Sequence, residues 1–213
     1  MNRRELAGIL LFGSLWGMLE CILGDFLRDQ NLPAGAIMTG LVAVAMMSYT
    51  RIVFRKRGMQ LGMAMVAGLL RLTNPFTGCL ICSAISIVSE GIIFEAIWYK
   101  LFDLREFRRP ATIASMGMIT SYLCYIGGFL VTQVLTPIVS SVAFNPNDLV
   151  VFLPQILARG LPAGILGIFS ILAIDRVRSY DISKLKSRLY YPVTVSLAVV
   201  CWILTIANSL LMG

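Results

Sequence analysis

The stretch Arg71-Leu72-Thr73-Asn74-Pro75-Phe76-Thr77-Gly78 interrupts two apolar runs, and the rest of the chain is best understood around it. Pro75 and Gly78 disfavour a helix, and the residue before a proline is pushed out of helical geometry. Because apolar residues flank the stretch, we expect it to lie at membrane depth. Non-helical backbone survives there only if protein buries it or if it lines a cavity, and transport sites are often built beside such breaks. The stretch therefore predicts a broken helix near Asn74-Pro75 that shapes the outer wall of a binding pocket.

The composition indicates an integral membrane protein. Of the 213 residues, 58% are hydrophobic and only 14% are charged, whereas a typical soluble domain is about half apolar and about a quarter charged. A helix needs roughly 20 residues to cross about 30 Å of hydrocarbon. Seven segments approach or exceed that length, namely 6–27, 33–54, 58–72, 77–99, 111–139, 149–174 and 190–212. We predict an all-α, polytopic membrane helical bundle of about seven transmembrane helices.

These segments form a single predicted membrane domain over residues 1–213. A six-helix core bundle covers residues 1–174 and is followed by a cytoplasmic, amphipathic linker over 175–189. An additional C-terminal helix covers residues 190–212. The linker alternates charged and apolar residues, so it is either a short interfacial helix or an ordinary solvated loop.

The basic residues predict the orientation in a cell membrane. Fifteen of the 18 lysines and arginines fall before the first segment or in every second loop after it, when Arg51 near the end of the second segment is counted with the loop that follows. By the positive-inside rule these loops are cytoplasmic, which places the N-terminus inside and the C-terminus outside. The same placement explains the net charge of +7 without a nucleic-acid partner.

Three charged residues stand out because an ionisable group inside a bilayer is costly and usually marks a pathway or a pocket. Counted from the cytoplasmic ends of their helices, Glu20 lies ~21 Å up, Arg71 ~20 Å and Arg159 ~24 Å. Three helices therefore place a charge at one level in the outer half of the membrane. Glu90 lies lower, at ~14 Å, and Glu95 at ~6 Å, where it reaches the cytoplasmic interface and needs no special role.

Two interpretations of this charged layer stay open. Glu20 could form a structural ion pair with Arg71 or Arg159 and hold the helices in register. Alternatively, an anionic or zwitterionic ligand could balance the second arginine, since the guanidinium group suits carboxylates and phosphates. Glu90 could also neutralise the excess positive charge.

Neighbouring polar and aromatic residues favour the pocket. Asn74 and Thr77 belong to the break itself, and Trp16 lies one helical turn below Glu20 on the same face. An aromatic wall beside a few polar groups is typical of a small-molecule site. The predicted substrate-binding residues are Glu20, Arg71, Asn74, Arg159, Glu90, Trp16 and Thr77.

The sequence offers no catalytic or metal-binding motif. It contains no histidine, which removes the most versatile acid–base group and metal ligand. Nucleophile-elbow, Walker and zincin motifs are missing as well. The five cysteines, including the Cys79-x-x-Cys82 pair, are predicted to be small buried hydrophobic residues. We therefore expect no enzyme activity, cofactor or metal ion.

Small residues supply a further pattern and a resemblance. Gly13 and Gly17 form a stripe on the first segment, and Leu32-Pro33-Ala34-Gly35 opens the second. Such stripes pack helices closely, either within one bundle or against another membrane subunit. With the chain length and the outer polar pocket, these features resemble the substrate-binding S component of an energy-coupling factor (ECF) transporter. The seventh segment, and glycine where that family usually has alanine in the stripe, depart from the family pattern.

The resemblance implies uptake of a small, vitamin-like molecule from outside. It also implies a membrane coupling subunit and cytoplasmic ATPases that dock through small residues of the first helices. Seven-helix cobalt and nickel members of the family bind metal through an N-terminal histidine, so that activity is not carried over. The leading hypothesis is a binding or transport protein for a small, water-soluble, anionic or zwitterionic molecule. The alternatives are a membrane assembly or scaffold protein with a structural charge layer, and a small intramembrane enzyme acting on lipid.

Overall fold

The protein is a bundle of helices. The computed structural model describes residues 2–73, 80–101, 107, 109–140, 146–177, 182 and 186–212, and these contain no β-strand. The helices are α1 (Arg3–Asp29), α2 (Ala34–Ile37), η1 (Met38–Ala43), α3 (Val44–Phe54), α4 (Met59–Leu72), α5 (Leu80–Ile97), α6 (Pro110–Ser140), α7 (Pro146–Val177) and α8 (Ser187–Met212). Because α2, η1 and α3 follow one another without a gap, the described chain has seven helical runs. Each run overlaps one predicted segment, so the predicted all-α membrane bundle is confirmed.

Five of these runs are long and apolar enough to cross a membrane: α1, the α2–η1–α3 run, α6, α7 and α8. As predicted, α4 is shorter, with 14 residues. It ends at Leu72, three residues before Pro75, and both the amide and the hydroxyl of Thr73 donate to the Leu70 carbonyl there. The predicted break at Asn74-Pro75 lies outside the described residues, as do residues 178–181 and 183–185 of the predicted linker.

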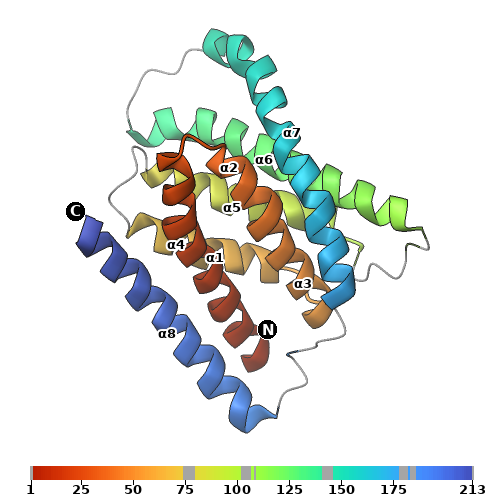
Figure 1. Ribbon diagram of the computed structural model, residues 1–213, viewed down its shortest axis with the longest axis vertical. Coiled ribbons are helices and arrows are strands. Elements are labelled where there is room, and N and C mark those ends of the chain that lie inside the picture. The colour runs from red at the N-terminus through yellow and green to blue at the C-terminus, as the bar shows by residue number, and fades with distance from the viewer. Residues whose placement is uncertain are drawn as a thin grey trace.

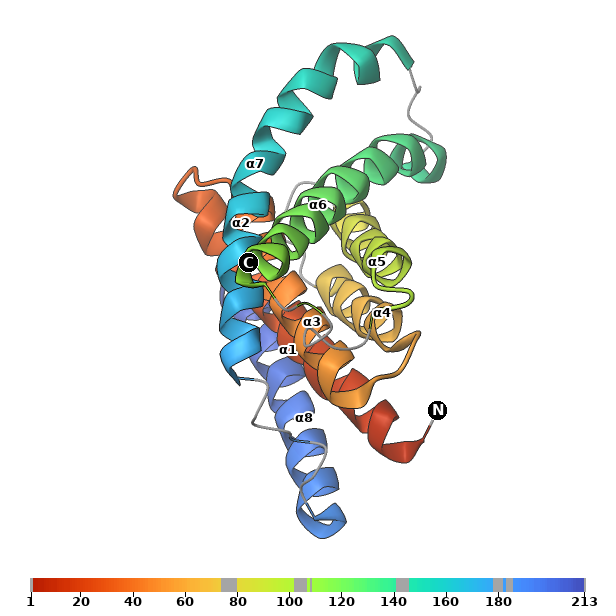
Figure 2. The same ribbon diagram turned by 90° about the vertical axis from the view of Figure 1, so that its right-hand side faces the viewer.

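The helices pack in a continuous sequence of neighbours (Figure 1). Helix α1 lies between α4 and α8, α4 packs on α5, α5 on α6, and α6 on α7. Helix α7 then packs against η1 and α3. Helix α8 runs along α1 at the edge of the bundle, and the first part of α7 extends beyond the other helices (Figure 2). This arrangement leaves the centre of the bundle to α1, η1, α4 and α5.

The glycine stripe of α1 packs against α4 within the chain. A Cβ atom at Gly13 would lie 2.8 Å from the Met63 carbonyl oxygen, and one at Gly17 would lie 3.0 Å from the Ala67 Cα. Backbones approach this closely only where side chains are minimal. The interpretation of the stripe as internal packing is therefore confirmed for these two glycines.

We expect Gly13→Ala to lower the free energy of unfolding by about 1–3 kcal/mol, the usual cost of overpacking a tight interior. The new methyl group would meet the α4 backbone, which cannot move aside as a side chain can. Gly24→Ala is the matched control on the same helix, because its Cβ would meet nothing nearer than 3.5 Å. Thermal unfolding of both variants in detergent tests this, and equal melting temperatures would contradict it.

The middle of the second helical run is π-helical over η1. Gly40 lies so close to α7 that an added Cβ would be 2.7 Å from the Ala163 carbonyl oxygen. The Gly40 carbonyl accepts a hydrogen bond from the Ser170 hydroxyl at 2.6 Å. π-Helical turns inside longer helices are frequent at functional sites. Here the π-helical turn includes Thr39, whose role is described below.

Candidate functional site

Arg71 is buried and already holds a carboxylate. Its guanidinium group donates to both oxygens of Asp25, at 2.8 and 3.2 Å, and its side chain is 1% exposed. It also donates to the Glu20 carbonyl oxygen at 3.3 Å and to the Ser83 hydroxyl at 3.2 Å. The structural ion pair considered for Arg71 therefore exists, but its partner is Asp25 instead of Glu20. Asp25 was not among the predicted residues because it lies close to the end of its helix.

The Glu20 carboxylate lies next to Trp16. The Trp16 indole is fully buried and donates to Glu20 Oε1 at 3.2 Å, which confirms the prediction that both residues share one face of the helix. In the described part of the chain Glu20 forms no ion pair. It lines a small cavity of about 80 Å³ together with Glu90, Arg28 and Thr39.

Glu90 of α5 is a carboxylate buried within the helical bundle. Its side chain is 5% exposed, and its Oε1 accepts a hydrogen bond from the Thr39 hydroxyl at 2.8 Å. Its Oε2 is buried and has no hydrogen-bond partner among the described residues. A buried carboxylate oxygen without a partner is costly, so such an atom in a native fold calls for an explanation. A bound ligand would provide one.

A larger cavity of about 590 Å³ adjoins the small one, since both are lined by Glu90, Arg28, Thr39, Ser83 and Ser86. It continues toward α7, where it shares Phe129 and Arg159 with a third cavity of about 320 Å³ that is also lined by Gln133. These volumes lie within the range of small-molecule sites. We call the three together the polar cavity.

The polar cavity brings together several of the predicted site residues. Glu20, Glu90 and Arg159 line it, although no hydrogen bond or ion pair joins their side chains in the described structure. Trp16 donates to Glu20, and Arg71 donates to Ser83, so both residues hold side chains that line the cavity. Asn74 and Thr77 lie outside the described residues.

Other residues of the site were not predicted. Ser83 and Ser86 precede the predicted residue Glu90 at spacings of three and four residues, which places all three on one face of the otherwise apolar helix α5. That polar stripe could have been found in the sequence. Arg28 and Thr39 were harder to predict. Arg28 follows the predicted end of the first helix, and the position of Thr39 depends on the η1 turn.

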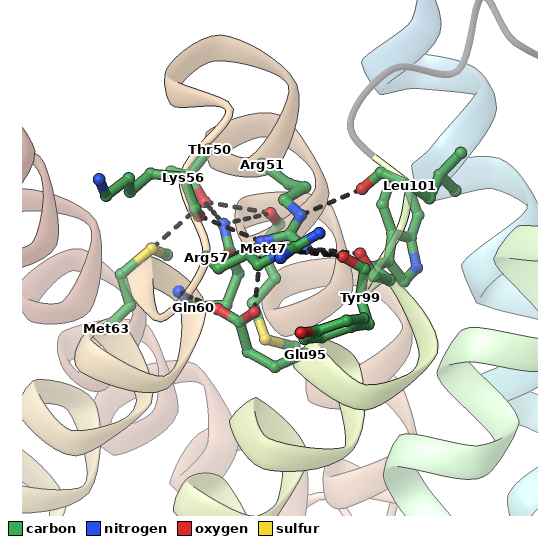
Figure 3. A network of polar contacts seen from close by, with 11 residues as sticks. Met47, Thr50, Arg51, Lys56, Arg57, Gln60, Met63, Glu95, Tyr99 and Leu101 are labelled. Carbon is green, nitrogen blue, oxygen red and sulfur yellow. Dashed lines mark hydrogen bonds and ion pairs between the residues drawn. The ribbon is translucent and has the colours of Figure 1, made fainter.

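A second buried polar cluster surrounds Arg51 at the end of α3 (Figure 3). Arg51 is fully buried and donates to Glu95 Oε2 at 3.2 Å and to the Lys56 and Leu101 carbonyl oxygens at 3.1 Å. It also donates to the Trp98 carbonyl oxygen. The expectations that Arg51 is an ordinary loop charge and that Glu95 needs no special role were therefore wrong. This cluster joins the ends of α3 and α5 to the start of α4.

The cysteines follow the prediction only in part. Cys21, Cys124 and Cys201 are buried, as expected. Cys82, which lines the polar cavity, is disulfide-bonded, so its prediction as a simple buried hydrophobic residue was wrong. The described residues contain no group of three or more side chains suited to bind a metal ion.

The chain was compared with protein-family models, with curated proteins and with solved structures, and none of them matches it. The candidate site therefore has to be interpreted from its own geometry. That geometry is a cavity lined by two carboxylates and two guanidinium groups, at the junction of α1, η1, α5, α6 and α7.

Proposed function

We propose that this protein binds a small, water-soluble, zwitterionic or anionic molecule in the polar cavity and moves it across the membrane. The observation that carries the proposal is the buried Glu90 carboxylate, whose Oε2 lacks a partner among the described residues while its side chain lines a cavity of about 590 Å³. Ionisable groups in membrane helices usually belong to substrate or ion pathways. Glu20, Arg28 and Arg159 line the same cavity system.

The direction of transport follows from the predicted orientation. Arg28 lies at the end of α1 and Ala34 at the start of α2, so the polar cavity lies near the α1–α2 connection. The basic residues Arg4 and Arg51 lie toward the other ends of their helical runs. If the basic loops are cytoplasmic, substrate enters the cavity from outside.

The resemblance to an ECF S component suggests the energy source, namely a membrane coupling subunit with cytoplasmic ATPases. In that family docking uses small residues of the first helices, but Gly13 and Gly17 are here packed against α4. A coupling subunit would therefore use another surface of the bundle. Purification of the tagged chain from its native membrane, followed by identification of bound ATPase subunits, tests this part of the proposal.

The scaffold hypothesis is the second candidate, and the Arg71–Asp25 ion pair favours it. A role in stabilising the fold is enough to explain both that ion pair and the Arg51 cluster. A scaffold, however, does not need the unpartnered carboxylate of Glu90 beside a large cavity. Ligand binding therefore separates the two functions.

We expect Arg159→Ala to weaken ligand binding at least tenfold, which corresponds to about 1.4 kcal/mol. Arg159 is exposed to the cavity rather than packed in the bundle, so the variant should fold normally. The ligand is first identified by mass spectrometry of molecules that copurify with the protein in detergent. Its affinity is then measured from the rise in melting temperature with concentration.

Arg188→Ala is the matched control, because Arg188 is exposed at the start of α8, which packs on α1. This control should bind as the natural protein does. A protein that neither copurifies with a small molecule nor gains stability from one would support the scaffold.

A further inference from the structure

Two carboxylates line the smallest part of the polar cavity. Glu20 and Glu90 both line the cavity of about 80 Å³, although only Glu90 is almost completely buried. Neither forms an ion pair with a described residue. Two like charges in so small a volume repel one another, and a cation between them would relieve that repulsion. The buried Arg71 pairs with both oxygens of Asp25.

The positive groups of the cavity are more exposed than its two carboxylates, although Arg28 lines the same small cavity. The Arg28 side chain is 52% exposed and comes within 3.8 Å of Asp25, which already pairs with Arg71. Arg159 is also exposed and lines the two outer cavities. Three carboxylates, on Asp25, Glu20 and Glu90, balance three guanidinium groups, on Arg71, Arg28 and Arg159, in formal charge. The charges are nevertheless separated by depth, since the two carboxylates that line the cavity are less exposed than the two guanidinium groups that line it.

From this separation we infer that the ligand is a zwitterion bound with its cationic end inward. An ammonium or amidinium group donates hydrogen bonds to Glu90 Oε2 and to Glu20, and a carboxylate or phosphate group faces Arg28 and Arg159. Tyr125 and Phe129 line the cavity of about 590 Å³ together with Glu90, Arg28 and Arg159, and aromatic faces attract cations. This inference rests on the proposed function and narrows its ligand class. It also differs from the sequence-based expectation, in which Arg71 bound an anion directly.

Glu90→Gln tests the inference, because glutamine has the same shape and can still accept the hydrogen bond from Thr39 while losing the negative charge. Three matched probes are used with the full-length protein: 5-aminopentanoate, pentylamine and pentanoate, each at 20 mM. The copurifying molecule is tested alongside them, and electrophoresis at acidic, neutral and alkaline pH shows whether it carries both an acidic and a basic group. Melting temperature is the readout throughout. Glu5→Gln is the control, since glutamine also suits that position at the start of α1.

We expect the zwitterionic probe to stabilise the protein more than either singly charged probe, or the copurifying molecule to be a zwitterion. Glu90→Gln should weaken binding of that ligand at least tenfold, and Glu20→Gln should act in the same direction and provide a second variant. Glu5→Gln should bind normally. If the best ligand is an anion or a neutral molecule, or if Glu90→Gln binds a zwitterion as well as the natural protein, the inference is wrong and the proposed function survives. If no ligand of any class binds, both are wrong.

Discussion

Replacing Asp25 with alanine is expected to lower the free energy of unfolding by about 3–5 kcal/mol, the usual cost of removing one partner from a buried ion pair. The cost arises because Arg71 is 1% exposed and keeps its charge in any protein environment. Without Asp25, the guanidinium group would retain only the Glu20 carbonyl and the Ser83 hydroxyl among the partners described above. Thermal unfolding of the purified variant in detergent measures the loss.

The double variant Asp25→Ala/Arg71→Leu distinguishes the cost of leaving the Arg71 charge without Asp25 from the cost of removing the Asp25 side chain itself. Removing both charges leaves no unpaired group, so this variant should be more stable than Asp25→Ala alone. Asp29→Ala is the matched single control, because Asp29 is exposed at the end of the same helix. It should change stability by no more than about 0.5 kcal/mol. Equal losses in Asp25→Ala and Asp29→Ala would show that the pair contributes nothing.

The same pair affects the polar cavity indirectly. Arg71 connects the Glu20 backbone on α1 to Ser83 on α5, and both residues line the cavity. Arg71 is therefore a positioning residue in the proposed site instead of a direct ligand-binding one. Its conservative replacement by lysine would keep the charge but lose the planar, bidentate contact with Asp25.

Hydropathy predicted the helices well because a bilayer imposes one simple requirement on them. Every backbone group must be satisfied within the segment, so long apolar runs become helices. The short α4 and the end of that helix before Pro75 followed from segment length and proline geometry alone. None of these features depends on which side chains meet.

The pairing of charges could not be predicted in the same way. Height along a helix placed Arg71 near Glu20, but the choice of Asp25 depends on how α1 is rotated relative to α4. The hydrogen bond that Glu90 accepts likewise depends on the position of Thr39, which is set by the π-helical turn η1. Neither rotation nor a π-helical turn has a clear sequence signal here. Predicting individual contacts therefore required the packed structure.

Arg51 shows the limit of interpreting charge from sequence position. It lies in the last turn of α3, next to Arg55, Lys56 and Arg57, and so looked like part of a basic loop. Its side chain instead turns inward and satisfies carbonyl groups beyond the end of α5, where no further helical turn can do so. A charge near a helix end can thus be structural even where the positive-inside rule also explains it.

Arg51→Ala is accordingly expected to cost about 3–5 kcal/mol, since it leaves Glu95, whose side chain is 16% exposed, without this partner. It also removes the donor to the Trp98 and Leu101 carbonyl groups. Arg51→Lys should lose less, because lysine retains the charge for Glu95 but has one nitrogen in place of the branched guanidinium group. Thermal unfolding in detergent should therefore rank the natural protein above the lysine variant and the lysine variant above the alanine variant.

Arg57→Ala is the matched control for this series, because Arg57 lies in the same cluster but is exposed. It donates to the Tyr99 carbonyl oxygen at 3.0 Å and lies 4.2 Å from the centre of the Tyr99 ring. Exposed contacts of this kind contribute about 0.5–1 kcal/mol. If Arg51→Ala were no less stable than Arg57→Ala, the buried cluster would not hold α3, α4 and α5 together. A large difference would instead identify Arg51 as the side chain that fixes the end of the bundle opposite the polar cavity, so that the site and its structural anchor are separate parts of the fold.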